Sequence, residues 1–577
     1  MKALIAGGLS AALLLAAPGL PRPVCAGSLD AIASDESLPR GVPEALIQTP
    51  PVQATQSVLD RPVSPMPGLA AAPAPAAADV QPATRPVAAS PRSFGVLQGL
   101  ASRVFLGRSG GNVQSRGLGS WRRLFDGGWA GPGAAPAVNS ASMEMRGKRI
   151  VIVGAGTPAK RPFLEKARQL GVRVILVDKG LSGLPRLFDW ARVHLLGLPS
   201  RDHWARGLVS ELVDVDLSAG SPEADERAAA ALRRSARKRG PLDGLTAYWE
   251  DDLIDAARIA QALGLRYHSV EAVETARSKH RTIERLSAAG VLPRRVSFKI
   301  ESRRDLEGLI GGGRVPQRWF LKPDGGAEAQ FDASYKDGRD LLAAYDALAA
   351  RLAASDDTVF KSNRTFTLTN ALEGPEWDYN VVLQGGRFID GRFTDNWPTR
   401  PGSRKATGYS LPSRVLTEPL KGSIHQMVVD SLEAIGARDG VFHVEGIGED
   451  LVEINMRPGG SYTLQANEAV YGVNEAELLL RLAAGLPVSV PRLERPLAYQ
   501  EGAFVFASER GTIKMIALTA AARAAGLHLR VEMTPGSVIT DQKNRVALVY
   551  AQASSAVEAL ALLGDDARSL LDLTIIP

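Results

Sequence analysis

The chain has 577 residues, of which 45% are hydrophobic and 23% are charged, and it contains a single cysteine. This length and composition are typical of soluble globular proteins with several domains. The net charge of +6 comes from scattered arginines, without a long Lys/Arg run or interleaved aromatic and basic residues. The sequence therefore gives no sign of nucleic-acid binding, and its charge indicates at most a weak attraction to anionic substrates.

The N-terminus has the features of an export signal. A basic start is followed by the apolar stretch Ala3–Ala17, which is too short to span a bilayer comfortably, and Val24-Cys25-Ala26 fits a small-residue cleavage site. Residues 1–26 are therefore predicted to be a signal peptide of a periplasmic or secreted protein. The alternative is translation from Met143 or Met145, which stand just before the first strong strand and would leave the protein in the cytoplasm.

The two regions that follow differ sharply in composition and in the pattern of their apolar residues. Residues 27–145 are rich in Pro, Ala, Ser and Gly and are predicted to be a disordered linker, because such segments bury too little apolar surface to fold. Between residues 146 and 270, apolar strands alternate with helices, which predicts a parallel, Rossmann-like sheet. The expected strands are Ile150–Val153, Val172–Val177, Leu208–Val213 and Gly244–Tyr248.

A second domain is expected over residues 271–490. It is predicted to contain a helix over Val273–Ala289, a strand over Trp319–Lys322, antiparallel strands over 358–397 and a helix over Lys421–Ile435. Residues 491–577 are read as a small domain with the order strand, helix, strand, strand, helix, strand, which suits a split βαβ arrangement. Its first helix is expected over Ile513–Ala525. This tail shows no clustered reactive residues, so a packing or lid role is expected.

A glycine turn follows the first strand. Gly154-x-Gly156-x-x-Ala159, with Asp178 about 20 residues later, imitates a dinucleotide fingerprint. One interpretation is a phosphate or substrate group held at a helix N-terminus. The other is a tight strand-to-helix turn that needs small residues.

The segment Val441–Gly460 predicts a two-stranded hairpin with its turn near Glu449. Side chains alternate between the faces of a strand, so Glu445 is expected opposite Glu453 and His443 opposite Asn455. Opposed like charges are destabilising, which favours a divalent cation between the two carboxylates. Arg457 on the same face indicates that phosphate accompanies the cation. The alternative is an exposed face that is polar for solubility.

Two lysines are candidates for phosphate binding. Lys322 ends a strand beside the flexible amides of Gly325 and Gly326, and Lys279 forms a cationic pair with Arg281 on a predicted helix. Each could instead be a solvated surface residue.

The order of these motifs resembles the ATP-grasp superfamily, and within it the L-amino-acid ligase and carnosine-synthase group of carboxylate–amine ligases. The motifs are the basic helix, the Lys-Gly loop, the Glu373-Gly-Pro-Glu376 turn and the final Glu-x-Asn-x-Arg-x-Gly-Gly element. The resemblance covers about Arg149–Ile576. It implies an α/β (α+β) protein with an ATP-grasp fold, a Rossmann-like pre-ATP-grasp domain and a small C-terminal domain.

The resemblance also implies an activity and roles for residues. The activity would be ATP-dependent and Mg-dependent ligation of a carboxylate to an amine, through an acyl phosphate, with amino acids as expected substrates and a homodimer as a possible assembly. Lys279 and Lys322 would hold the ATP phosphates beside Gly325 and Gly326. The backbone of Asn370, Ala371 and Leu372 would bracket adenine, and Glu376 would bind ribose. Glu445, Glu453 and Asn455 would coordinate two Mg²⁺ (or Mn²⁺) ions, and Arg457 would steady the transferred phosphoryl group.

Further expectations concern the substrates. The loop Glu328–Asp337 is the expected lid, and Arg392–Ser413 with the turn Gly459–Ser461 is expected to recognise substrate. His443 is expected either to orient Glu445 or to assist proton transfer. Two rival functions remain open. One is an ATP-binding module with impaired catalysis. It is favoured by the loop Gly325–Gln330, which has Glu328 where the resembled family commonly has a neutral residue, and by the export signal, since the periplasm is not expected to supply ATP. The other is an NAD-dependent oxidoreductase, based on the first glycine turn.

Overall fold

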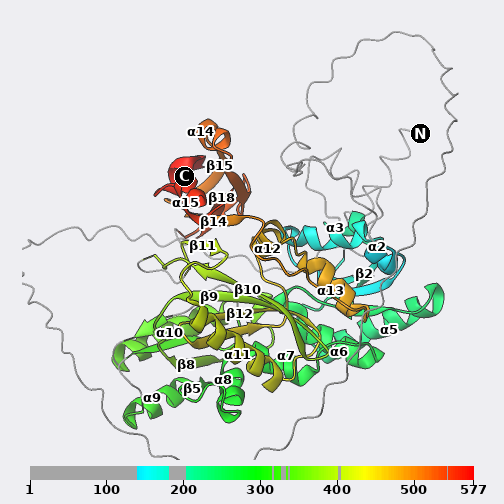
Figure 1. Ribbon diagram of the computed structural model, residues 1–577. Coiled ribbons are helices and arrows are strands. Elements are labelled where there is room, and N and C mark those ends of the chain that lie inside the picture. The colour runs from blue at the N-terminus through cyan, green and yellow to red at the C-terminus, as the bar shows by residue number, and fades with distance from the viewer. Residues whose placement is uncertain are drawn as a thin grey trace, which may run out of the picture. The chain divides into compact units, whose positions relative to one another are not determined.

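Figure 1 shows the structure, which is a computed structural model. It describes residues 140–180, 203–314, 318–326, 333–335, 338–400, 405–541 and 544–577. All of these residues belong to one compact unit, Gly127–Pro577. The predicted signal peptide, nearly all of the predicted linker and most of the expected lid lie outside the described residues. Among the helices that are described, none is both long and apolar enough to cross a membrane.

The first sheet is parallel, as the alternation of strands and helices predicts. Its order is β3-β2-β1-β4. Alternate residues of β1 pack on opposite sides: Val151 and Val153 lie in a cluster with α5 and α6, and Ile150 and Ile152 lie in a cluster with α3. The elements are β1 (Arg149–Val153), α3 (Arg161–Gln169), β2 (Arg173–Asp178), β3 (Glu211–Asp214), α5 (Pro222–Arg239), β4 (Gly244–Thr246) and α6 (Leu253–Leu263). The expected strand from Leu208 starts later because residues 206–208 form a 3-10 turn.

A second, antiparallel sheet has the order β5-β8-β6-β7. The helix expected over Val273–Ala289 is in fact two helices, which meet at Ser278. Its extended backbone ends the first helix, and its side chain caps the second by accepting from Arg281 N. The elements are α7 (Val270–Arg277), α8 (Lys279–Ala288), β5 (Ser297–Ile300), α9 (Arg303–Gly311), β6 (Trp319–Pro323), β7 (Ala333–Tyr335), α10 (Gly338–Ala353) and β8 (Phe366–Asn370).

The largest sheet has eight strands in the order β13-β12-β9-β10-β11-β14-β18-β16. Phe442 and Val444 of β12 point into the core beneath α7 and α11, so the alternate residues His443 and Glu445 point to the other face. This alternation places polar side chains in a row above an apolar layer. The elements are β9 (Glu376–Gln384), β10 (Arg387–Asn396), β11 (Gly408–Leu411), α11 (Glu418–Ala434), β12 (Gly440–Ile447), β13 (Asp450–Asn455), α12 (Thr463–Tyr471) and α13 (Glu475–Ala483).

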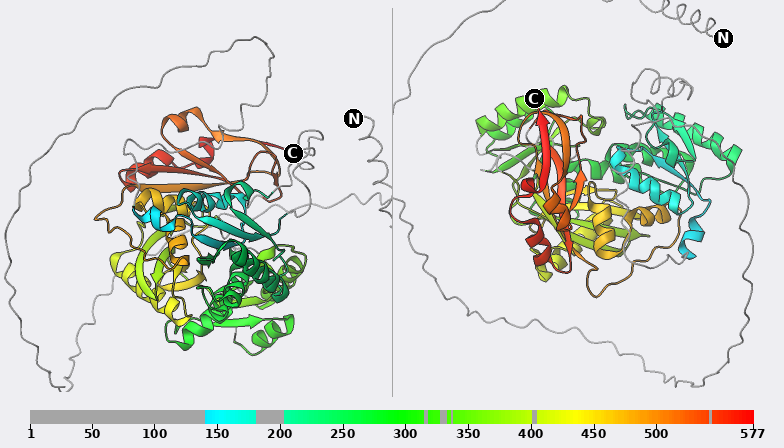
Figure 2. Two further views of the ribbon diagram at one scale, coloured as in Figure 1. Left: turned by 90° about the vertical axis from the view of Figure 1, so that its right-hand side faces the viewer. Right: turned by 90° about the horizontal axis from the view of Figure 1, so that it is seen from above.

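The C-terminal region contributes to two sheets. Strands β14, β18 and β16 extend the large sheet, and β17, β15 and β19 form a sheet of their own, as the orange-to-red elements show in Figures 1 and 2. The elements are β14 (Tyr499–Phe506), β15 (Gly511–Leu518), α14 (Ala520–Ala524), β16 (His528–Val531), β17 (Val538–Ile539), β18 (Arg545–Ala553), α15 (Ala556–Leu563) and β19 (Leu571–Ile576).

The prediction of a helix over Ile513–Ala525 is wrong. Residues 511–518 form strand β15, and only Ala520–Ala524 are helical. The pairing of β15 with β19 slips between Ile513 and Met515, so Ile513 and Ile516 are both buried although they are three residues apart. This bulge gives the strand a spacing of apolar residues that imitates a helix.

Candidate active site

The hairpin of β12 and β13 has the predicted register. His443 pairs with Asn455 and Glu445 with Glu453. On the other side of β12, strand β9 places Asp378 beside Glu445, so three carboxylates stand in a row across three strands. Burial, and then the charge of Glu453, raises the pKa of Glu445 above its ordinary value. The site therefore disfavours negative charge until a cation or a proton neutralises it.

Neighbouring groups orient these carboxylates. Asn455 donates its Nδ2 hydrogen to Glu445 Oε1 at 3.2 Å, and His443 Nδ1 lies 2.8 Å from Asn380 Oδ1. The other ring nitrogen of His443 lies 3.6 Å from Glu445 and 3.8 Å from Asp378. Burial raises the pKa of Asp378 to about 7, and His443 opposes this rise. His443 thus contacts two of the three carboxylates, those of Glu445 and Asp378, while its other ring nitrogen contacts Asn380.

The break at Ser278 brings Lys279 to the same place. Lys279 is the first residue of α8, and its Nζ lies 3.0 Å from Glu453 Oε2. Ser278 Oγ donates to Asp324 Oδ2 at 2.6 Å, and His280 N donates to Asp324 Oδ1 at 2.7 Å. Asp324 stands directly before the glycine loop, so it ties the start of α8 to that loop. Although burial opposes it, the hydrogen bonds from Ser278, Thr367 and His280 lower the pKa of Asp324.

A cavity of about 300 Å³ lies between these elements. Eight of the residues singled out in the sequence line it together: Lys279, Lys322, Gly326, Asn370, Leu372, Glu376, Glu445 and Glu453. Two other candidates, Gly325 and Ala371, are their chain neighbours but do not line the cavity. The side chain of Asn370 is engaged elsewhere, because its Oδ1 accepts from Arg295 at 3.2 Å and from Val296 N at 3.1 Å.

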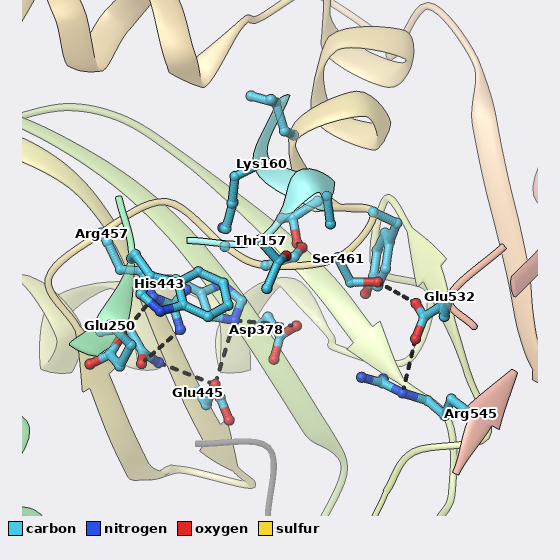
Figure 3. Close-up of a pocket in the computed structure, with 18 of the residues that line it drawn as sticks. Thr157, Lys160, Glu250, Asp378, His443, Glu445, Arg457, Ser461, Glu532 and Arg545 are labelled. Atoms are coloured by element: carbon cyan, nitrogen blue, oxygen red, sulfur yellow. Dashed lines mark hydrogen bonds and ion pairs between the residues drawn. The ribbon is translucent and has the colours of Figure 1, made fainter. Parts of the chain in front are cut away.

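A larger cavity of about 540 Å³ adjoins the first, since Glu376, Glu445 and Glu453 line both. Asn455 and Arg457, the remaining predicted site residues, lie in its wall, as does the turn Gly459–Ser461. Arg457 Nε lies 2.6 Å from Glu250 Oε2 (Figure 3). Glu250 also accepts from Arg277 at 2.8 Å. Although its burial acts in the opposite direction, Arg457 and Arg277 lower the pKa of Glu250. Glu250 thus remains an anion that fixes Arg457 in the cavity wall.

The first glycine turn borders this larger cavity through Thr157 and Lys160. Asp178 accepts a hydrogen bond from Ala155 N at 2.8 Å, so its carboxylate holds the turn. Gly154 has a φ of +73°, and a Cβ there would lie 1.6 Å from Asp252 Oδ2. The small residues therefore serve a tight turn, while the residues just after it face the site.

The sequence interpretation missed several cavity residues. Glu250 follows the end of β4, where parallel sheets place ligands, so its position could have indicated a role. The tail was expected to pack or to cover, but Arg530, Glu532 and Arg545 line the larger cavity. Ser461 donates to Glu532 at 2.8 Å, and Glu532 lies 3.5 Å from Arg545. Figure 3 draws both contacts as dashed lines. No local pattern marks these residues, because pairing of distant strands brings them there.

The expected substrate segment Arg392–Ser413 contributes only in part. Asn396, Lys405 and Ala406 line the larger cavity, and Thr399 lines the smaller one. Arg392 does not, because it is buried, pairs with Asp390 and stacks over Tyr471 at 4.9 Å.

The row formed by Asp378, Glu445 and Glu453 is a candidate metal site. In the part of the chain that the structure describes, no three His, Cys, Asp or Glu side chains form a metal site by themselves. Two carboxylates with an amide still suit Mg²⁺, which proteins commonly hold with one or two carboxylates while substrate phosphates and water complete its shell. The two carboxylates and the amide therefore fit a cation that binds together with a phosphate group.

Comparisons with known proteins give several similar chains. A scan of protein families gives no match to the chain. The chain is 27% identical over 414 residues to carnosine synthase 1 of Homo sapiens, an alignment that covers 67% of this chain and 47% of that protein. It is 23% identical over 381 residues to the ATP-grasp enzyme fsqD of Aspergillus fumigatus, covering 59% and 60% of the two chains. The chain thus spans less than half the length of the carnosine synthase.

Among solved structures, the chain matches the L-amino acid ligase from Bacillus licheniformis with a TM-score of 0.60 and 19% identity. The match covers 75% of this chain and 100% of that chain. At this level of identity the match establishes a shared fold.

Proposed function

Because the chain belongs to the ATP-grasp superfamily, we propose that it joins a carboxylate to an amine in a reaction that consumes ATP. The observation that carries the proposal is the convergence of two lysines and two facing carboxylates on one cavity. Lys279 and Lys322 approach it from α8 and β6, and Glu445 and Glu453 approach it from the hairpin. Opposite charges at this spacing suit a nucleotide whose phosphates come with a divalent cation.

The smaller cavity would hold the nucleotide. Lys279 and Lys322 would bind its phosphates, together with backbone amides of Gly325 and Gly326. The backbone of Asn370, Ala371 and Leu372 would border the adenine, and Glu376 would accept hydrogen bonds from ribose hydroxyls. A cavity of about 300 Å³ is at the lower end of the range of small-molecule sites.

Glu445, Glu453 and Asn455 would hold two Mg²⁺ ions. When bound, such ions neutralise the phosphate charge and align the transferred phosphoryl group. The raised pKa of Glu445 supports this assignment, because a cation between the carboxylates would remove the repulsion that raises it.

Arg457 lies in the wall of the larger cavity, which shares Glu445 and Glu453 with the smaller one. Its Nε is held by Glu250, and its Nη1 donates to Pro458 O at 2.9 Å. In the first step a carboxylate oxygen of the substrate attacks the γ-phosphorus and ADP leaves. The guanidinium of Arg457 would bind the phosphoryl oxygens during this transfer, which is mainly a matter of positioning and charge stabilisation.

The second step would take place in the larger cavity. The amine attacks the carbonyl carbon of the acyl phosphate, phosphate leaves and the nitrogen gives up a proton. Acidic groups such as Asp378 lie in this cavity together with basic groups such as Lys160, which suits substrates that carry both an ammonium and a carboxylate. We therefore expect amino acids as substrates. His443 would orient Glu445 and Asp378 from its anchored position.

The test is ADP release from the full chain with ATP, Mg²⁺ and pairs of amino acids. The proposal expects at least one pair to release ADP and to form an amide. Glu453→Ala should abolish both while the far-ultraviolet circular dichroism stays that of the wild type. Folded protein that binds ATP but never releases ADP would instead favour a binding module without catalysis.

A further inference from the structure

Lys160 lies in the larger cavity, and among the described residues no carboxylate forms an ion pair with it. It ends the 3-10 turn after β1, its exposed fraction is 7%, and it points into the cavity in Figure 3. Its Nζ lies 5.5 Å from the ring centre of Phe163 and 5.9 Å from that of Trp249. Burial, and then the charges of Arg457 and Arg530, lower the pKa of Lys160 to about 7.

Arg530 reaches the same cavity from strand β16, 370 residues further along the chain. Its carboxylate neighbour Glu532 is already engaged by Ser461 at 2.8 Å and by Arg545 at 3.5 Å. Burial lowers the pKa of Arg530, and Glu532 opposes this effect. Arg530 thus stands partly buried without an ion pair to any described residue.

Unlike Lys160 and Arg530, the other two arginines that line this cavity have carboxylate partners. Arg457 is held by Glu250 and Arg545 by Glu532. Lys160 and Arg530 line the same cavity, and the charge of Arg530 is one of those that lower the pKa of Lys160. Two partly desolvated cations that line one cavity, and that form no ion pair with a described residue, favour an anionic ligand there.

We infer that Lys160 and Arg530 together bind the carboxylate that the amine-donating substrate keeps in the product. This inference rests on the proposed ligase function. The carboxylate that is activated must reach the γ-phosphate beside Glu445 and Glu453, and neither Lys160 nor Arg530 lines that smaller cavity. The carboxylate bound by the pair is therefore a different one. The amine-donating substrate is an amino acid with a free carboxylate, and simple amines or amino-acid carboxamides are poor substrates.

The experiment compares two amine donors with the full chain. Hydroxylamine has no carboxylate and intercepts an acyl phosphate as a hydroxamate, so it reports the activation step alone. A panel of amino acids, each beside its carboxamide, reports the complete reaction. Lys160→Met and Arg530→Met are each expected to raise the KM of the amino-acid donor roughly 10- to 100-fold, because each removes a charged hydrogen bond. Hydroxamate formation should stay within about twofold of the wild type in both variants.

The controls separate binding from folding. Lys514→Met removes an exposed lysine of β15 and should change neither reaction. Lys160→Arg keeps a positive charge and should recover most of the amino-acid KM, whereas a purely structural role of Lys160 would not be rescued in this way. Unchanged KM for the amino-acid donor in both methionine variants would overturn the inference. So would an equal fall of hydroxamate formation, which would place the pair in activation.

A different result is expected if the ligase proposal itself is wrong. Wild-type protein would then form neither ADP nor hydroxamate with any carboxylate. Calorimetric binding of amino acids and their carboxamides to the wild type and to Lys160→Met still decides the inference in that case. Preference for the free carboxylate that is lost in Lys160→Met supports it, and equal binding of both ligands contradicts it.

Discussion

Replacing Lys160 by methionine should stabilise the protein. The ammonium of Lys160 is buried beside Arg457 and Arg530, and its pKa falls from 10.5 to about 7. At about 1.36 kcal/mol per pKa unit, keeping this group charged in the native state costs roughly 5 kcal/mol. Methionine fills a similar apolar volume against Phe163 and Trp249 without a charge. The native protein therefore retains a destabilising charge that the ligand site needs.

The pH dependence follows from the same shift. Below about pH 7 Lys160 is protonated in both the folded and the unfolded chain, so the full cost is present. Between pH 7 and about 10.5 the unfolded chain holds a proton that the native protein has released, so the stability of the wild type rises with pH. The advantage of Lys160→Met should be largest at pH 6 and should shrink by about 1.4 kcal/mol for each pH unit above 7.

Urea unfolding of the wild type and of Lys160→Met, followed by circular dichroism at pH 6, 7.5 and 9, measures this difference. The variant should have the higher midpoint at pH 6, and the two midpoints should approach each other at pH 9. Lys514→Met, which removes an exposed lysine, should leave the midpoint unchanged at every pH. A variant that is less stable than the wild type at pH 6, or a difference that does not change with pH, would refute the reasoning.

Three further predictions concern the hairpin and its surroundings. Glu453→Gln should remove Mg-dependent ADP release and also the rise in Tm that Mg²⁺ with ATP gives the wild type; a Tm rise that persists would contradict the metal assignment. Arg457→Met should lower kcat by at least about 100-fold with little change in the Kd for ATP, because the guanidinium acts on the transferred group; an unaltered kcat would exclude that role. Gly446→Ala should cost about 1–3 kcal/mol in urea unfolding, because a Cβ at this position would lie 2.0 Å from Trp377; wild-type stability would mean that the ring moves aside.

The parts of the site that depend on short-range pattern could be predicted. Alternation along two short strands is enough to oppose Glu445 and Glu453, and the register of the hairpin is as expected. The position of Lys322 at a strand end is likewise local. In these segments the period of the side chains and the turn together leave little freedom.

The remaining features depend on long-range pairing. Ser278 divides a periodic helical stretch because Asp324, 46 residues away, accepts from its hydroxyl. The bulge in β15 makes a strand imitate a helix, since its partner strand lies near the C-terminus. Glu250 and Arg530 enter the site from elements far apart in the chain, and no property of their immediate neighbours shows that they will meet. Such contacts are set by tertiary packing rather than by local propensity.

Transfer of oxygen from the carboxylate to phosphate tests the proposed function most directly. The carboxylate substrate of any pair that releases ADP is labelled with oxygen-18 and incubated with the wild-type protein, ATP, Mg²⁺ and the amine. Mass spectrometry of the inorganic phosphate should find one labelled oxygen for each amide bond formed, because the acyl phosphate breaks between the carbonyl carbon and that oxygen. Amide formation with unlabelled phosphate would contradict activation of the carboxylate beside Glu445 and Glu453.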